Sequence, residues 1–262
     1  MHPLLNIAVR AARSAGDFIS RYSERVDSLQ ITEKSRNDFV TEVDKGAEKT
    51  IIDTIRKAYP DHSILAEESG QHSGNEYEWI IDPLDGTTNF LYGFPHYAVS
   101  IAVRHKGRIS QGVIYNPISQ ELFTASRGEG AQLDGRRLRV TSRKGLEGAL
   151  LGTGIPYRDD QMHLMDDYLG MLKALIPGSA GIRRPGSAAL DLAYVAAGRL
   201  DGFWEMDLNI WDIAAGVLLV EEAGGLVGDF KGGMDYLENG NIVAANPKVF
   251  KAMLQTIKPF VK

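Results

Sequence analysis

The stretch that decides the fold is WIIDPLDGTTNF, residues 79–90. Its three opening apolar residues predict a short buried strand. Two aspartates, a proline, a glycine and two threonines follow, and the segment holds no lysine or arginine that could neutralise the acids. We therefore expect the strand to end at a polar site that draws its positive charge from elsewhere.

The two aspartates of this stretch are close enough in sequence to act together. Asp82 stands where the predicted strand ends, and Pro83 fixes φ there. Asp85 follows three residues on, so a turn would bring both carboxylates to one side. Gly86 and Thr87 offer backbone N–H groups and a hydroxyl at a helix start, a place that favours anions such as phosphate. Two carboxylates beside an anion require a cation between them. Mg²⁺ is the obvious one, because it is a hard cation that is usually held by a few carboxylates together with substrate phosphate.

Taken alone, the D-x-x-D spacing is explained at least as simply by helix capping as by a metal. Three other segments favour the metal, because each places an acid at the end of a predicted element: AEESG at 66–70, WDIAAG at 211–216 and FVTEVDKGAE at 39–48. One acid near a helix start is ordinary, but several beside small residues indicate a two-metal site, the usual clamp for displacement at phosphorus. A structural Ca²⁺ is the weaker alternative, because the sequence has no EF-hand-like loop.

The rest of the chain alternates between helical and strand patterns. Apolar residues at helical spacing predict helices near the N-terminus, from Thr41 to Pro60, and at 162–176, 186–198 and 211–225. Turn signals between short apolar runs predict an antiparallel meander over 97–138. Further short strands are expected at 62–65, 201–205, 226–230 and 241–245. This order favours an α+β layered sandwich in one domain over a doubly wound parallel sheet.

Composition excludes several classes of protein. The 262 residues are 44% hydrophobic and 24% charged, as in ordinary globular proteins, and the net charge of −5 argues against a general grip on nucleic acid. The three arginines at 136, 137 and 139 are best explained as a solvated hairpin flank. Cysteine is absent, which excludes disulfides and thiol nucleophiles. The opening residues lack a signal-peptide pattern and no apolar run is long enough for a membrane span, so we expect a cytoplasmic protein without a membrane partner.

The motif DPLDGTTNF, followed later by WDIAAG and EEAGG, closely resembles the inositol monophosphatase family of Mg²⁺-dependent, Li⁺-sensitive sugar phosphatases. The resemblance runs from NDFVTEVD through AEES to AGGLVGDF, almost the whole chain. GSAALDLAYVAAGR and RGEGAQLDGRRLRV are most similar to the bacterial SuhB-type branch. The resemblance implies a layered αβαβα sandwich with mixed and antiparallel sheets, an N-terminal half over about 1–140, a C-terminal half over about 141–262, and a homodimer.

The same resemblance implies a role for each matching residue. The ligands of a first metal would be Glu67, Asp82 and the backbone carbonyl of Leu84. The ligands of a second would be Asp82, Asp85 and Asp212, and a weaker third ion would use Glu67 and water, giving two to three Mg²⁺ ions. The catalytic group would be Asp44, Thr87 and Glu67. The substrate side would comprise Gly86, Thr87, Ala188, Glu205 and Asp212.

The activity that the resemblance implies is hydrolysis of inositol 1-phosphate, or of related polyol phosphates, by direct attack of a metal-activated water. Phosphatases of 3′-phosphoadenosine nucleotides or fructose 1,6-bisphosphate share the metal motif and stay open as alternatives. The sequence shows no basic pocket for a second phosphate, which counts against both.

A non-catalytic role is also open, because the SuhB-type branch includes partners of RNA polymerase and the transcription elongation and antitermination machinery. The surface features to examine for it are Arg183-Arg184 and the RRLRV hairpin at 136–140, although substrate-side or solvated arginines are the simpler interpretation.

Three residues near the motifs need separate interpretation. Asp207 stands where many family members have glycine, so it adds a negative charge near Glu205 and puts the preferred alcohol in doubt. Glu68 beside Glu67 either supports the metal ligands or is a solvated loop carboxylate. For His96 we expect a structural role rather than that of a general base.

Overall fold

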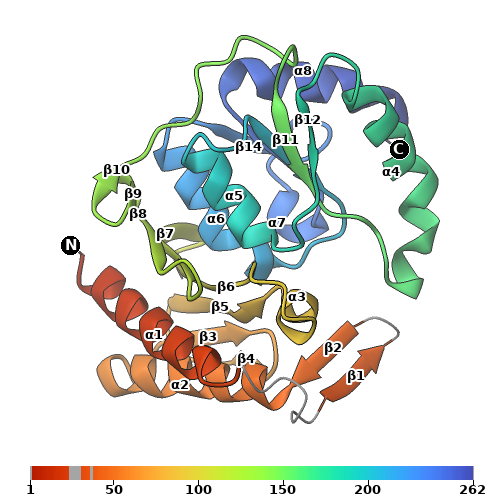
Figure 1. Cartoon of the computed structure of the whole chain (residues 1–262). Coiled ribbons are helices and arrows are strands. Elements are labelled where there is room, and N and C mark those ends of the chain that lie inside the picture. Colours follow the sequence, from red (N-terminus) through yellow and green to blue (C-terminus); the bar gives the residue numbers. More distant parts are fainter. Residues whose placement is uncertain (1, 24–30, 36–37, 262) are drawn as a thin grey trace.

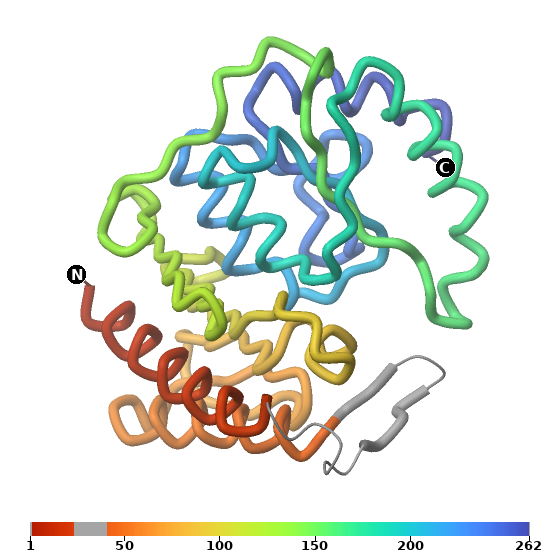
Figure 2. Tube along the Cα trace, viewed as in Figure 1, coloured from red at the N-terminus to blue at the C-terminus, as the bar shows by residue number. Residues whose placement is uncertain are grey.

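The structure of the chain is a computed structural model that describes residues 2–23, 31–35 and 38–261. Asn37, which opens the NDFVTEVD motif, lies outside the described residues. The molecule is built from five layers, helix–sheet–helix–sheet–helix (Figure 1). The predicted α+β sandwich is therefore confirmed. Figure 2 follows the chain as it leaves the larger sheet near residue 140 and crosses to the smaller one.

The larger sheet has eight strands in the order β10-β9-β8-β7-β6-β5-β3-β4. Their bounds are β3 (Ser63–Ala66), β4 (Gly70–His72), β5 (Tyr77–Asp85), β6 (Ala98–His105), β7 (Arg108–Asn116), β8 (Glu121–Ser126), β9 (Gly130–Leu133) and β10 (Arg136–Arg137). Neighbours are antiparallel except β3 and β5, which run parallel. The predicted meander over 97–138 is confirmed as β6 to β10. A separate hairpin of β1 (Ile31–Ser35) and β2 (Asp38–Thr41) precedes this sheet.

Two helices cover the outer face of the larger sheet. These are α1 (Pro3–Ser20) and α2 (Glu42–Ala58). α1 starts with a proline at its first position, where no backbone N–H is needed, and turns a fully buried stripe of alanines toward the sheet and α2. α2 starts with a capping box, in which Thr41 and Asp44 exchange side-chain and backbone hydrogen bonds. This cap fixes the Asp44 side chain beside Thr87, which follows the carboxyl end of β5.

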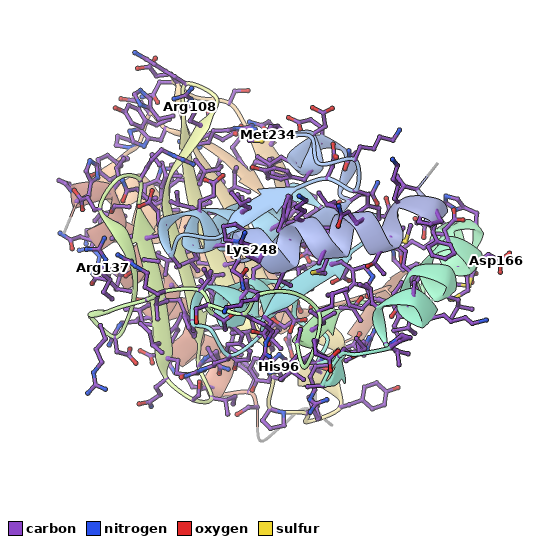
Figure 3. All side chains as sticks on the ribbon, turned by 90° about the horizontal axis from the view of Figure 1, so that it is seen from above. His96, Arg108, Arg137, Asp166, Met234 and Lys248 are labelled. Atoms are coloured by element: carbon purple, nitrogen blue, oxygen red, sulfur yellow. The ribbon has the colours of Figure 1, made fainter. Side chains whose placement is uncertain are left out.

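The smaller sheet has five strands in the order β12-β11-β13-β15-β14. Their bounds are β11 (Leu150–Thr153), β12 (Gly181–Arg183), β13 (Gly202–Glu205), β14 (Leu226–Gly228) and β15 (Ile242–Ala245). β11 runs parallel to both β12 and β13, and the other pairs are antiparallel. The outer helices on this side are α4 (Met165–Leu175) and α8 (Pro247–Ile257). In Figure 3 Lys248 marks α8, and Arg137 of β10 and Asp166 of α4 mark opposite sides of the molecule.

The central layer consists of α5 (Ala188–Ala196) and α6 (Ile210–Glu222), which pack against both sheets. Both helices are apolar nearly all round, as expected for helices that are buried on every side. Gly216 lets them approach closely, since a Cβ there would lie 2.5 Å from Cβ of Leu192. The N-terminal turns of both helices lie beside the carboxyl end of β5. The remaining helices are short: α3 (Thr87–Leu91) and α7 (Tyr236–Asn239).

The decisive strand, β5, differs from its prediction in one respect. It does not end at Asp82: Asp82 pairs with Ser100, the register then shifts, and Asp85 pairs with Ala98. Pro83 lies inside this bulge, where a residue without a backbone N–H costs the sheet no hydrogen bond. The bulge bends the strand, so both aspartates lie together at the carboxyl end of β5.

Some elements were not predicted or have other limits. The helix expected over 162–176 begins as a 3₁₀ helix, Asp159–Leu164, and continues as α4. The hairpin β1–β2 and the strands β4, β11 and β12 were missed, because each is short and has no clear alternation. Within the described residues no helix combines the length and the apolar content that a membrane crossing needs.

Candidate active site

A pocket of about 390 Å³ opens where β5, α3, α5, β13 and α6 meet. Nine of the ten site residues expected from the sequence line it: Glu67, Asp82, Leu84, Asp85, Gly86, Thr87, Ala188, Glu205 and Asp212. The tenth, Asp44, lies behind Thr87 and is 1% exposed. The nine lining residues come from five separate places in the chain and share one cavity.

Asp82 lines the pocket and is buried, at 2% exposure. The bulge of β5 turns the Leu84 N–H back to the Asp82 Oδ1 atom, to which it donates over 2.9 Å. Burial raises the pKa of Asp82 well above its ordinary value, and the negative charges of Glu67, Asp85 and Asp212 raise it further. The folded chain therefore holds four carboxylates close enough to repel one another.

Asp85 joins the larger sheet to the central helix layer. Its Oδ2 accepts hydrogen bonds from the Ser187 hydroxyl (2.6 Å) and from the Ala189 N–H (2.7 Å) at the start of α5. Burial raises the pKa of Asp85 to about 6, and these hydrogen bonds oppose the rise. The N-terminal turn of α5 thus favours the ionised form of an acid from another layer.

Asp212 is presented by the first turn of α6. Its Oδ2 accepts from the Asn209 N–H over 2.7 Å, one half of a capping box with Asn209. Burial raises the pKa of Asp212 well above its ordinary value, and the charges of Asp85 and Glu67 raise it further. The cap fixes the carboxylate at the pocket wall and leaves its other oxygen available.

Thr87 and Asp44 form a hydrogen-bonded pair beside the bulge. The Thr87 hydroxyl lies 2.9 Å from Asp44 Oδ1 and 3.0 Å from the Leu84 carbonyl oxygen. Thr41 donates to Asp44 through both its hydroxyl and its N–H. Burial raises the pKa of Asp44 although these bonds oppose it. Gly86 precedes Thr87 with φ +95°, a left-handed conformation that glycine adopts without strain.

The donor set of the pocket fits a hard divalent cation. Within the described residues Asp82, Asp85 and Asp212 form no ion pair with lysine or arginine, although each is held among like charges. Carboxylate and carbonyl oxygens are the ligands that Mg²⁺ and Ca²⁺ prefer. In the described part of the chain no group of three or more acidic or histidine side chains is already arranged to hold a metal ion. A divalent cation in the pocket would relieve the mutual repulsion of these carboxylates.

The opposite half of the pocket is built around Glu205, at the end of β13. Its carboxylate folds over Gly154, where a Cβ would lie only 1.6 Å from Glu205 Oε1. Burial raises the pKa of Glu205 to about 8, the Asp85 charge adds to the rise, and the Arg184 guanidinium opposes it. Asp191 of α5 also lines this half. It is 1% exposed, and its Oδ1 has no hydrogen-bond partner among the described residues.

Among the described residues, Arg158 and Arg184 line the pocket, although the sequence shows no pattern that marks a basic pocket for a second phosphate. Arg158 lies in the loop before the 3₁₀ helix, and Arg184 follows β12. The segment around Arg158 has no periodic pattern, so its position beside the motif was not predicted. Arg184 stacks over the Tyr157 ring at 5.7 Å. Arg183 and Arg184, interpreted from the sequence as substrate-side or solvated arginines, are both exposed, and Arg184 also lines the pocket.

The three residues singled out near the motifs have distinct positions. The Asp207 carboxylate contacts Arg158 and Gln161 instead of standing free beside Glu205. The Glu68 N–H donates to the buried Glu48 carboxylate over 2.8 Å, which anchors the turn that carries Glu67. His96 does not line the pocket, and its carbonyl accepts from the Asn89 side chain, in keeping with a structural role.

Sequence reasoning missed Ser187, Asp191 and Arg158. A signal for Ser187 exists in hindsight, since serine before a run of helix formers is a usual N-cap, and its side chain accepts from the Leu190 N–H. No such signal exists for Asp191, because one acid in an apolar helix ordinarily marks a solvated face. The arginines of the RRLRV hairpin are exposed, as expected.

Comparison with known proteins identifies the relatives of this chain. The family model described as "Inositol monophosphatase family" matches residues 1–260. The protein named Nus factor SuhB from Pseudomonas aeruginosa is 60% identical over 99% of this chain and 97% of that protein. The crystal structure of extragenic suppressor protein suhB from Bartonella henselae matches with TM-score 0.96 and 46% identity, covering 99% of this chain and 100% of that one. The structure of inositol monophosphatase from Anabaena matches with TM-score 0.86 and 38% identity, covering 98% and 95%. This chain therefore belongs to the inositol monophosphatase family.

Proposed function

We propose that this chain hydrolyses phosphomonoesters in a Mg²⁺-dependent reaction, with inositol 1-phosphate as the leading substrate and related polyol phosphates as further ones. The observation that carries the proposal is the convergence of Asp82, Asp85 and Asp212, from separate segments, on a pocket whose other half holds Glu205 and Arg184. An acid cluster of this kind suits metal-assisted displacement at phosphorus.

The proposed metal ligands are Glu67, Asp82, the Leu84 carbonyl, Asp85 and Asp212, for two to three ions. When bound, Mg²⁺ would neutralise the acids, hold the phosphate and activate water. Leu84 and Asp82 belong to the same bulge, so the backbone that bends β5 also sets the spacing of these oxygens.

The chain's own groups supply orientation and a path for the proton. Thr87 donates to Asp44, so its oxygen can accept a proton from an attacking water while Asp44 takes the Thr87 proton. The N–H groups at Gly86 and Thr87 are proposed to hold the phosphate oxygens, since the first turn of a helix leaves its N–H groups without partners in the helix.

The alcohol of the substrate is proposed to lie between Ala188 and Glu205. Ala188, at 7% exposure, gives a small apolar floor. Glu205 and Asp212 offer oxygens to substrate hydroxyls, and an unpaired hydroxyl in such a site would cost binding. A histidine base has no place in this scheme, and the chain has no cysteine nucleophile.

Side-by-side assays test the proposal. Inositol 1-phosphate, 3′-phosphoadenosine 5′-phosphate and fructose 1,6-bisphosphate are hydrolysed in parallel with Mg²⁺, with EDTA, and with Mg²⁺ plus millimolar Li⁺. We expect the inositol ester to react fastest, EDTA to abolish the reaction and Li⁺ to inhibit it. Clear preference for either of the other two substrates would overturn the substrate assignment.

A second candidate function rests on the relatives. The 60% identical protein of Pseudomonas aeruginosa is named a Nus factor, so a role as a partner of the transcription elongation and antitermination machinery is proposed for this chain as well. This role would place the chain in the cytoplasm. Asp82→Asn separates the two functions: association with RNA polymerase that survives complete loss of hydrolysis would show an independent binding role. The family's homodimer is a further proposal, which analytical ultracentrifugation would check.

A further inference from the structure

One carboxylate, that of Asp207, ties a loop across the alcohol side of the pocket. Gln161 Nε2 donates to Asp207 Oδ2 over 3.2 Å and approaches the Asp207 carbonyl oxygen at 3.4 Å. Arg158 Nη2 lies 3.5 Å from the same Oδ2. All three residues line the pocket. The loop that follows β11 is thus joined to the turn that connects β13, which ends at Glu205, to α6, which begins just before Asp212.

The backbone at Asp207 is unfavourable for most side chains. Its φ is +57°, in the left-handed region that glycine prefers and that Asp and Asn tolerate best among other residues. The turn is held there by the Leu208 N–H, which donates to the Gly240 carbonyl over 3.0 Å. An aspartate on such a backbone, with its carboxylate in the pocket wall, points to a task for that carboxylate.

Both arginines among the described residues of this half of the pocket have acids near them. Arg158 faces Asp207 on the pocket side and Asp160, at 3.4 Å from its Nε, on the outer side. Arg184 stacks on Tyr157, and its charge opposes the burial that raises the pKa of Glu205. Each arginine that lines the pocket therefore has an acid beside it. Hydroxyl groups can bond to such a surface, but a second phosphate would meet an acid beside Arg158 and beside Arg184.

We propose that Asp207 is a specificity-determining residue: by engaging Arg158 it disfavours esters that carry a second anionic group and leaves uncharged polyol monophosphates as the preferred class. The inference rests on the proposed function and names what selects its substrate. Arg158 freed from Asp207 would be a ready partner for a second phosphate, because guanidinium binds phosphate with two parallel hydrogen bonds.

The expected size of the effect follows from electrostatics. A phosphate dianion bound within several ångströms of the Asp207 carboxylate is repelled in a partly solvated pocket, so removing that charge should improve kcat/KM for a bisphosphate roughly tenfold. The Asp207 side chain is 48% exposed. Salt should therefore screen the effect, and the gain should shrink as ionic strength rises.

Asp207→Asn is the variant that tests the inference. The amide tolerates the left-handed backbone, keeps an oxygen for Gln161 and removes the charge. The ratio of kcat/KM for fructose 1,6-bisphosphate to that for inositol 1-phosphate is measured at low and at high salt. We expect the ratio to rise roughly tenfold at low salt and less at high salt. Adding Arg158→Gln to Asp207→Asn should remove the gain, because the freed arginine is what would bind the second phosphate.

Two control variants separate charge from backbone and from general effects on Arg158. Asp160→Asn removes a charge from the same arginine on its outer, 71% exposed side and should leave the ratio unchanged. Asp207→Gly removes the charge and relieves the strained backbone, and it should match Asp207→Asn. A ratio that changes in the glycine variant alone would attribute the effect to the backbone and overturn the inference.

The outcomes also separate this inference from the function beneath it. A wild-type chain that hydrolyses inositol 1-phosphate, with a ratio unmoved by Asp207→Asn, overturns the role of Asp207 alone. A wild-type chain that hydrolyses no phosphomonoester with Mg²⁺ overturns the proposed function and this inference together.

Discussion

The hydroxyl of Ser187 donates to the Asp85 carboxylate over 2.6 Å, which joins two residues 102 positions apart in the chain. The same hydroxyl caps α5 by accepting from the Leu190 N–H. One side chain therefore stabilises a helix of the central layer and orients an acid of the larger sheet. This double role makes Ser187 a good place to separate stability from function.

Ser187→Ala should lower both the stability of the fold and the affinity for divalent ions. Loss of the N-cap should cost about 1 kcal/mol of unfolding free energy. Loss of the hydrogen bond should raise the pKa of Asp85 further, so more protons compete with Mg²⁺ near neutral pH. Denaturant unfolding and Mg²⁺ titration by calorimetry measure the two effects.

A matched control for Ser187→Ala is Asn246→Ala. Asn246 caps α8 by accepting from the N–H groups of Lys248 and Val249, and it does not line the pocket. The Asn246→Ala variant should lose a similar unfolding free energy and keep its affinity for Mg²⁺. Equal loss of Mg²⁺ affinity in both variants would contradict a specific role for the bond between Ser187 and Asp85.

Gly154→Ala should impair the alcohol side of the pocket. Its new Cβ would overlap Glu205 Oε1, so the Glu205 carboxylate must move. We expect kcat/KM for inositol 1-phosphate to fall roughly tenfold or more, since small displacements of positioning groups are costly. p-Nitrophenyl phosphate, which offers no hydroxyls to Glu205, should lose much less. Gly145→Ala, where a Cβ meets nothing within 4 Å, serves as the control.

Asp82→Asn should abolish activity and yet stabilise the chain in EDTA. The buried Asp82 is held among like charges, and the neutral amide can still accept from the Leu84 N–H. We expect kcat to fall by at least ~100-fold, the melting temperature in EDTA to rise, and the stabilisation by added Mg²⁺ to disappear. Melting curves with and without Mg²⁺ decide the matter. An Asp82→Asn variant that melts at a lower temperature than wild type in EDTA would show that repulsion among these carboxylates does not destabilise the metal-free fold.

The success and the failures of sequence interpretation have physical causes. Asp82, Asp85 and Asp212 were predictable because each belongs to a local motif at the end of an element. Ser187 and Asp191 join the site only because α5 packs between two sheets, which no local pattern encodes. β11 pairs in parallel with β12 and β13, which lie far along the chain, and segments of three or four residues do not specify a partner. The division into halves near residue 140 stays a prediction.

The stability of the N-terminal half should depend on the protonation of His62. His62 is 8% exposed and stacks between the rings of Tyr59 (4.5 Å) and Tyr77 (4.8 Å). Its Nδ1 accepts a hydrogen bond from the Trp79 indole N–H over 3.0 Å, so the folded chain holds the neutral ring. Burial lowers the pKa of His62 below the ordinary value of 6.5.

The sign of the effect follows from that direction. As pH falls through 6.5, the unfolded chain takes up a proton at this histidine before the folded chain does, so stability decreases until the folded His62 is protonated too. One proton sets an upper limit of about 1.4 kcal/mol per pH unit on the slope. His62→Gln, which keeps an acceptor for Trp79, should flatten the dependence of unfolding free energy on pH between 7.5 and about 5.5. His163→Gln, at an exposed histidine, should leave the slope as in wild type. Equal slopes in His62→Gln and wild type would contradict this origin of acid sensitivity.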